Sequence, residues 1–567
     1  MIPQFFNKIF GHLKDQYSID GRSISLFRIS LGVVLLIDIL LRIPEIGSFY
    51  TDNGVLPRYV ELTNTVNHFK FSIHHAFGSI FGQVLIFVLH LFVTTLFIFG
   101  HQTKLTTFIL WVLTSSLHSR NYLVLQSGDT ALRLFIFWSL FLPIHGNHSF
   151  DTYSKKLKLV TNKFFNVGTL AIFSQIAIIY FFAGYEKSYE SYFLSGDALR
   201  LAMNLERYAT TFGHSLLAFP EFLKFGSRFS YLAELLCPIF LFFPFKNWIF
   251  RSVILFCFLS FHIGTVFMME VGFFPFISIT MWILLIPSQA FDYLKKFKKI
   301  NSVEVSIGHQ FYNLPFRALL IMLNLFEVKI HFSNETNEFK INNKEASKDE
   351  LINLIVRHSL FYTPWTARIL RFFMKFTMEL NQLSFSTYKS LAQKSVTAIG
   401  CLLLLYNVVL NLRPLKNLSS TSRKIVQEVE GFDLLKHGLN FEQRWGMFSP
   451  EPSRSDGWHI IYGERYNGAK VDLWGTDFRT PLEKPESVAA TYRNQRWRKY
   501  LDTVVRETHK GYRPYFLQHI CYEINKYKKN PLMKLKKVYH RFTEELTLEN
   551  NEVKINEIDY GSVTCLK

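Results

Sequence analysis

The segment VGTLAIFSQIAIIYFFAGYEK, Val167–Lys187, decides the fold class. Its part Val167–Gly184 contains no charged residue and is close to the length of about 20 apolar residues that a membrane-spanning helix needs. Charge returns at Glu186 and Lys187. The segment therefore predicts a membrane-spanning helix that ends at an interface, where the lysine either anchors the helix end or is held for chemistry.

The composition of the whole chain supports this interpretation. Of its 567 residues, 49% are hydrophobic and 59 are Phe, whereas only 19% are charged. Soluble domains usually contain about 25% charged residues. Because the apolar residues are gathered in long runs, the chain is predicted to be a mostly α, polytopic membrane protein.

Nine apolar runs are predicted membrane spans, about eight in one bundle and one later in the chain. Several are shorter than the usual length of about 20 residues, so flanking semi-polar residues would complete them, or one run would be re-entrant. The runs are Ile24–Leu41, Gln83–Phe99, Leu105–Leu117, Ala131–Ile144, Val167–Gly184, Phe229–Phe245, Ile249–Met269, Gly272–Pro287 and Val396–Leu412.

The net charge of +19 arises from 63 basic and 44 acidic residues. In a membrane protein, such an excess orients the chain through cytoplasmic lysines and favours contact with anionic lipid. The sequence contains no basic motif of a known nucleic-acid reader. Membrane lipid is therefore an expected partner, and nucleic acid is not.

Two lysine-rich segments predict the orientation. The loop Gly146–Asn166 and the run Lys295–Lys299 should face the cytoplasm, together with the N-terminus. The loops Ile43–Gly82, His118–Thr130 and Tyr185–Arg228 then open on the opposite side, as does everything after the ninth span. Three such loops on one face predict a shared chamber at the outer leaflet.

The chain divides into five predicted regions. Its first residues place Phe5, Phe6, Ile9, Phe10 and Leu13 on one helical face, which is typical of a helix lying on a membrane or of an ordinary amphipathic start. The regions are an interfacial segment at 1–22, a transmembrane bundle at 23–290, a cytoplasmic α+β insertion at 291–395, a span at 396–412 and an extracytoplasmic β-containing domain at 413–567.

Strand patterns occur in the insertion and in the last region. The alternation in FEVKIHF, Phe326–Phe332, indicates a strand. In WHIIYGERYNGAKVDLWG, Trp458–Gly475, two β-rich runs flank Asn467-Gly468, a pair favoured in tight type I′ turns. The sequence therefore predicts a hairpin at this point.

The five cysteines form no CxxC pair and no Cys/His spacing typical of zinc, so no metal site is predicted. Cys237, Cys257 and Cys401 lie in apolar runs and are interpreted as core thiols. Cys521 and Cys565 either pair, if their compartment is oxidising, or remain two free thiols.

Ionisable side chains in the predicted spans are the candidate functional residues, because such groups usually face a bundle interior or a cavity. His262 precedes Glu270 by about two helical turns, so both would face one cavity, although His262 would also suit a buried core. Arg28 lies more than one turn inside its span. Lys187 would act as a base only if burial lowered its pKa, and the neighbouring Glu186 works against that.

Two aspartates occupy similar motifs, Asp129 in SGDTALR and Asp197 in SGDALR. Both are interpreted as helix N-caps, with Ser127 and Ser195 as the alternative capping residues. We therefore expect a structural role for them.

Four stretches in the first half of the chain carry a family resemblance. They are LFRISLGVVLLIDILLRIPEIGSFYTDNGVLPR, RNYLVLQSGDTALRLFIFWSLFLP, YFFAGYEK…SGDAL and H…MEVGFFPF. In this order they resemble the HTTM (horizontally transferred transmembrane) family, which is related to vitamin K-dependent γ-glutamyl carboxylase. The resemblance covers about Ser23–Pro287, and QRWGMFSPEP, Gln443–Pro452, looks like the outer domain of the same family.

The resemblance implies an activity and its co-substrates. The carboxylase oxygenates a reduced vitamin K hydroquinone, and the resulting alkoxide removes a γ-proton from a glutamyl side chain, to which carbon dioxide adds. Reduced vitamin K or another quinol, dioxygen and carbon dioxide would be the co-substrates, and a Glu-containing protein the substrate. Lys187, which follows YFFAG, would deprotonate the quinol, and His262 matches the histidine of the family.

This chain departs from the carboxylase at two places. Where the carboxylase has an Asn-His-Ser-Tyr-Leu motif, SRNYL stands at Ser119–Leu123, so Arg120, Asn121 and Tyr122 are candidate pocket residues. Glu186 stands where the carboxylase has a second lysine. Two further interpretations therefore remain: a non-catalytic lipid- or quinone-binding or transport protein, and a plain scaffold.

The insertion has a fainter resemblance of its own. Asn301–Lys394 resembles the thioredoxin-like DCC domain that is fused to some HTTM proteins. That domain carries a CxxC-type site, and none lies between Cys257 and Cys401. The resemblance therefore implies a degenerate domain that has lost redox activity.

Overall fold

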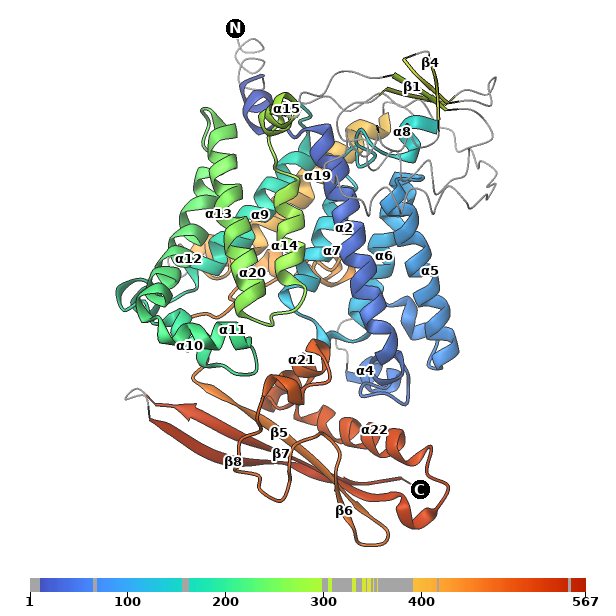
Figure 1. Cartoon of the computed structure of the whole chain (residues 1–567), viewed down its shortest axis with the longest axis vertical. Coiled ribbons are helices and arrows are strands. Elements are labelled where there is room, and N and C mark those ends of the chain that lie inside the picture. Colours follow the sequence, from blue (N-terminus) through green and yellow to red (C-terminus); the bar gives the residue numbers. More distant parts are fainter. Residues whose placement is uncertain are drawn as a thin grey trace.

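The computed structural model describes residues 11–64, 69–154, 163–297, 391–415, 418–548 and 552–566, with short pieces between 304 and 354. A helical bundle forms the middle of the molecule, and the C-terminal region lies against one of its ends (Figure 1). A small sheet lies near the opposite end (Figure 1). The predicted interfacial face at Phe5, Phe6, Ile9 and Phe10 falls outside the described residues.

Each of the nine predicted spans falls on a helix. Some of these helices continue beyond the apolar runs into polar residues, as α6 does, which ends at Arg120. The helices are α2 (Gly21–Arg42), α5 (Ile80–Phe99), α6 (Thr103–Arg120), α7 (Ser127–Ser139), α9 (Val167–Tyr185), α12 (Pro220–Phe240), α13 (Asn247–Met268), α14 (Phe274–Ile283) and α19 (Leu391–Leu410).

Fewer than nine of these helices meet the length and composition of a full span. Among the described residues, four do: α2 with its continuation to Tyr50, α5, α9 and α13. A fifth results if α14 and α15 (Ser288–Phe297), which are bent by 84° at their junction, count as one. These helices indicate an integral, multi-pass membrane protein.

The predicted eighth span, Gly272–Pro287, contains α14 and ends where the helix is broken. The chain bends between Ile283, where α14 ends, and Ser288, where α15 begins, and Pro287 lies in this break. Proline disfavours helical geometry in the residue before it, so the break at this position has a local cause.

Short helices at one end of the bundle face the C-terminal region. They include α3 (Ile46–Tyr50), α4 (Arg58–Asn64), α10 (Ala198–Asn204) and α11 (Thr211–Ser215). In Figure 1, α4, α10 and α11 lie at this lower end, whereas α8 (Phe150–Ser154) and α15 lie at the other. The first and third predicted outer loops thus share a side with the C-terminal region.

The C-terminal region is built on an antiparallel sheet of order β6-β5-β7-β8. Its helices α21 (Gln495–Val504) and α22 (Arg513–Asn525) lie between this sheet and the bundle (Figure 1), and α20 (Ser420–Glu430) precedes it. The strands are β5 (Ser455–Arg465), β6 (Lys470–Asp472), β7 (Leu535–Thr547) and β8 (Val553–Thr564).

Two sequence features of this region have clear structural outcomes. The predicted hairpin is confirmed, since β5 pairs antiparallel with β6 across the turn at Asn467-Gly468. Gly468 has φ +82°, a conformation that glycine adopts without steric cost. Cys521 in α22 and Cys565 after β8 form a disulfide, which decides between the two alternatives left open by the sequence.

Four short strands are described in the insertion, in the order β2-β1-β3-β4 with β1 and β2 parallel. They are β1 (Glu304–Ile307), β2 (Lys329–Phe332), β3 (Phe339–Ile341) and β4 (Lys344–Ala346). Strand β2 covers the second half of the predicted strand Phe326–Phe332. Most of the remaining insertion lies outside the described residues, and its relation to a thioredoxin-like domain stays a prediction.

Candidate functional site

A cavity of about 1170 Å³ lies where the bundle meets the C-terminal region, and we call it the chamber. Helices α6, α7 and α9 contribute to its walls, as do the chain after α19 and helix α21. Its charged lining residues are Lys70, Arg133, Arg413, Arg444, Lys499, Glu186 and Glu442, and its aromatic ones are Tyr122, Phe182, Trp445 and Tyr512.

Hydrogen bonds hold the walls of the chamber together. Arg133 donates to the backbone oxygens of Asn440 and Glu442, at 3.0 and 3.3 Å. The hydroxyl of Tyr122 donates to that of Tyr512 at 2.8 Å and so joins the bundle to the C-terminal region. The bundle and the C-terminal region therefore form the chamber together.

A buried amide network supports one wall. Gln443 accepts from Gln175 of α9 at 2.9 Å and from the indole of Trp445 at 2.9 Å. Its own amide donates to Asn407 of α19 at 2.6 Å, and Asn407 donates to Gln175 at 3.1 Å. The motif QRWGMFSPEP thus begins with residues that fix the C-terminal region to two bundle helices.

Charged groups next to the chamber form a second junction. Arg496 of α21 enters the bundle and contacts Asp38 at 2.7 Å and Asp129 at 2.5 Å. Arg42 contacts the same two carboxylates, at 2.8 and 2.6 Å. All four side chains are buried, so two positive and two negative charges compensate one another away from water.

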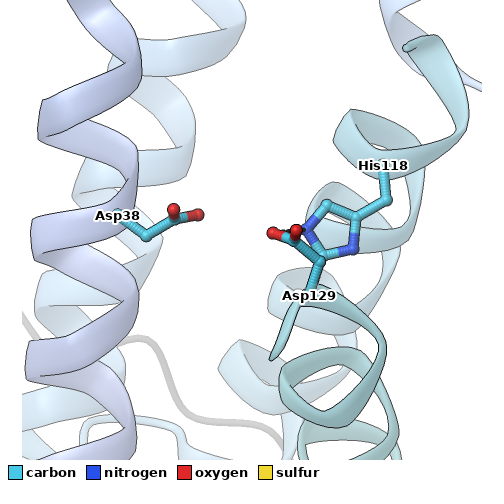
Figure 2. Close-up of side chains that lie close together, drawn as sticks. All are labelled: Asp38, His118 and Asp129. Carbon is cyan, nitrogen blue, oxygen red and sulfur yellow. Dashed lines mark ion pairs between the residues drawn. The ribbon is translucent and has the colours of Figure 1, made fainter. Parts of the chain in front are cut away.

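Asp38, His118 and Asp129 each place one possible metal-ligand atom within 4.8 Å of the others. Figure 2 shows Asp38 pointing toward the carboxylate of Asp129 and the ring of His118. The carboxylates already bind Arg42 and Arg496, so no net negative charge is left for a divalent cation. We interpret this cluster as an interdomain junction.

Asp129 therefore does more than the sequence predicted. Its carboxylate accepts from the backbone N–H of Gln126 at 2.7 Å, which is the capping role at the N-terminus of α7. The residue that occupies the N-cap position is Gln126 rather than Asp129. Asp197 is the N-cap of α10, but its side chain makes no capping hydrogen bond and instead pairs with Arg200 at 3.1 Å.

Lys187 lies beside the chamber and is not among its lining residues. Its amine is ion-paired with Glu234 of α12 and lies 4.9 Å from the centre of the Tyr192 ring. The side chain is only 6% exposed, so the amine is kept from bulk water, as its predicted role requires. The neighbouring Glu186 does line the chamber.

His262 is fully buried between α9, α13 and α14. Its Nε2 is hydrogen-bonded to the hydroxyl of Tyr180 at 2.6 Å, and that hydroxyl accepts from Trp282 at 2.9 Å. Tyr180 precedes Lys187 by seven residues, about 10 Å along a helix. The structure thus does not bring His262 and Lys187 into contact, and their catalytic roles stay predictions.

Three of the candidate pocket residues hold backbone segments. Arg28 donates to the oxygens of Ile144 and His145 near the end of α2 that lies away from the C-terminal region. Arg120 donates to the oxygen of Leu56 at 2.9 Å, and Asn121 to that of Phe49 at 3.0 Å. All three are buried and are absent from the chamber lining.

The two remaining candidates line different cavities. Tyr122 lines the chamber, and the amine of Lys70 lies 4.1 Å from the centre of its ring. Glu270 lines a smaller cavity of about 280 Å³ together with Gln495. Of the seven residues predicted for the site, Tyr122 is therefore the one found in the chamber wall.

Several chamber residues escaped the sequence analysis. Lys70 and Lys499 lie in segments with no membrane span and no recognisable motif. The sequence therefore gave no indication that these lysines line a cavity. Burial lowers the pKa of both lysines, although Glu61 and Glu442 counteract this for Lys70. Burial and the hydrogen bond with Tyr512 raise the pKa of Tyr122.

Comparison of the chain with protein-family models, with curated proteins and with solved structures gives no match. The chemistry of the site therefore has to be argued from the chamber. It offers cations for an anionic substrate, aromatic walls for a planar or lipid-borne group, and lysine amines withdrawn from water.

Proposed function

We propose that the chain is a carboxylase-like membrane enzyme of the HTTM type, which uses a quinol and acts on a glutamyl or lipid-borne substrate in the chamber. The observation that carries the proposal is the charge of the chamber, which three arginines and two lysines line against two carboxylates. Such an excess of positive charge in a partly enclosed space favours an anionic substrate. Because the walls come from both bundle and C-terminal region, a membrane-borne reactant and a polypeptide can meet there.

The residues present fit a quinol. Tyr122, Phe182, Trp445 and Tyr512 offer aromatic faces and two hydroxyls, and the volume of about 1170 Å³ is ample for a drug-sized ligand, which needs about 300–1,000 Å³. When bound, the quinol would supply the electrons that dioxygen accepts, and carbon dioxide would be the group added. The role of the protein's own residues would be to orient the head group of the quinol and to accept a proton from it.

The family resemblance assigns proton acceptance to Lys187. The ion pair with Glu234 can transfer one proton from the ammonium to the carboxylate, which leaves a neutral amine beside a carboxylic acid. His262 would act at a distance, by fixing Tyr180 on α9.

The same ion pair favours a second candidate function. An ammonium that stays paired with Glu234 is no base, and a chamber that only binds an anionic lipid or a quinone needs none. A non-catalytic binding or transport protein would retain the cations and aromatic walls of the chamber. It would purify with bound lipid or quinone and would leave Glu-containing peptides unchanged.

We further propose that the N-terminus is cytoplasmic and the C-terminal region extracytoplasmic. The disulfide between Cys521 and Cys565 supports this assignment, because disulfides persist in oxidising compartments. The substrate would then reach the chamber from the outer side of the membrane.

The test is a carboxylation assay on the purified chain in lipid nanodiscs. With reduced vitamin K, dioxygen and a Glu-rich peptide, radiolabelled bicarbonate should be incorporated into the peptide. Incorporation should vanish without quinol, without dioxygen, or with Gln in place of Glu in the peptide. Co-purified quinone or lipid without any incorporation would favour the binding protein instead.

A pair of matched variants tests whether the charge of the chamber matters. Arg444 is an exposed chamber residue, and Arg479 is an exposed arginine outside the chamber lining. Arg444→Glu should raise the KM for the Glu-rich peptide several-fold, whereas Arg479→Glu should leave it unchanged. Equal KM values for the two variants would count against substrate binding in the chamber.

A further inference from the structure

Lys499 differs from the other lysines at this end of the bundle. Lys187 is ion-paired with Glu234, and Lys70 lies 3.8 Å from Glu61 and over the ring of Tyr122. Lys499 lines the chamber and forms no ion pair within the described part of the chain. Its amine is therefore available to a bound molecule.

The position of Lys499 is fixed by the interdomain junction. Lys499 follows Arg496 by three residues in α21, so the two side chains share one face of the helix. Arg496 binds Asp38 and Asp129 and also donates to the backbone oxygen of Val124 at 3.0 Å. These contacts hold that face of α21 against the bundle, where the chamber opens.

The surroundings of Lys499 favour its neutral form. Burial lowers the pKa of this amine, Arg506 and Arg498 add to the effect, and Asp502 and Asp129 oppose it. The remaining charged groups of the chamber are mostly cationic and also disfavour a further positive charge. They are Lys70, Arg133, Arg413, Arg444, Glu186 and Glu442.

We propose that Lys499 is the catalytic amine of the chamber and takes a proton from an acidic O–H group of the bound quinol or phenol. In this step the O–H bond breaks, its electron pair stays on oxygen, and a new N–H bond forms on Nζ. The resulting ammonium faces the oxyanion and later returns its proton to water. The inference rests on the proposed function and places the proton acceptor on α21 of the C-terminal region instead of at Lys187, after the end of α9.

The first test is chemical labelling of the full chain in nanodiscs with pyridoxal 5′-phosphate, followed by borohydride reduction and peptide mass spectrometry. This aldehyde carries an anionic group that suits the chamber and reacts only with neutral amines. Lys510, which is 68% exposed, is the reference in the same region. Lys499 should be labelled about tenfold faster than Lys510 at neutral pH, and its labelling should reach half-maximum at a lower pH. Equal rates and equal pH profiles would overturn the proposal.

The second test separates proton acceptance from charge alone. Lys499→Arg keeps the positive charge but removes a base, because arginine does not lose its proton in proteins. In the carboxylation assay this variant should lose most of kcat and keep its KM for the Glu-rich peptide, whereas Lys510→Arg should behave like the unchanged chain. A retained kcat would overturn the role of Lys499.

The two tests keep the two proposals apart. If Lys499 is labelled selectively while no carboxylation is found, the reactive amine stands and the carboxylase-like function fails. If carboxylation is found but Lys499 labels like Lys510, the function stands and the proton acceptor lies elsewhere.

Discussion

At the scale of single residues, the lysines of this chain differ in the charged groups that surround them. Lys187 has a carboxylate partner in Glu234, whereas Lys499 has none among the described residues. The sequence pointed to Lys187 because it directly follows an apolar run. It could not point to Lys499, because the chamber also takes lining residues from α6, α7 and α9, several hundred residues earlier.

The ion pair between Lys187 and Glu234 should be costly to break on one side. In Lys187→Met, Glu234 would remain buried and unpaired, and stability should fall by about 3–5 kcal/mol. The double variant Lys187→Met with Glu234→Leu should recover most of this loss, because apolar pairs replace buried ion pairs at little cost. Thermal unfolding of the detergent-solubilised variants measures both effects.

The double variant also bears on catalysis. If Lys499 is the proton acceptor, the double variant should keep most of its carboxylation activity once its fold is restored. A double variant that is no more stable than Lys187→Met alone would contradict the assigned energetics of the ion pair.

At the scale of elements, helix α21 links the C-terminal region to the bundle. Arg496 reaches Asp38 across 458 positions of the sequence, and Asp129 across 367. Hydrophobic periodicity shows where helices form, but it carries no information about which distant charges meet. The sequence therefore placed Asp38 and Asp129 on their helices without revealing their common partner.

Removal of the contacts that Arg496 makes with Asp38 and Asp129 should weaken the packing of α21 against the bundle. In Arg496→Gln, Arg42 would face two buried carboxylates alone, and the junction should weaken by about 3 kcal/mol. Amide hydrogen exchange in residues 495–504 should become faster, and proteolysis of the C-terminal region should increase. Arg506→Gln, at an exposed arginine after the same helix, is the control. Exchange rates that match those of the control would show that the junction does not hold α21.

At the scale of the whole molecule, apolar runs predicted a membrane bundle and strand patterns predicted a β-containing region after it, and the structure has four or five candidate spans among its described residues and a C-terminal antiparallel sheet. All nine apolar runs fall on helices, and among the described residues four or five of these helices have the length and composition of a full span. The remaining helices stay predicted spans. The chamber could be expected from three outward loops, but its lining could not, since it depends on how the C-terminal region docks.

The disulfide should contribute strongly to the C-terminal region. It joins residues 44 positions apart, and closing a loop of that length in the unfolded chain is worth about 4 kcal/mol. Replacing both Cys521 and Cys565 by Ser should lower the denaturant midpoint of this region accordingly. In the unchanged chain, maleimide should spare both disulfide cysteines until a reductant is added. Labelling of Cys521 without reductant would contradict the pairing.

The central claim is that a quinol-type molecule and an anionic substrate meet in the chamber between bundle and C-terminal region. The most direct measurement is photo-crosslinking of a photoreactive naphthoquinone to the chain in nanodiscs, with the labelled peptides mapped by mass spectrometry. The account predicts labels at Tyr122, Trp445 and Tyr512, reduced by an excess of unlabelled quinone. Saturable labelling confined to the surroundings of His262, with none in the chamber, would contradict it.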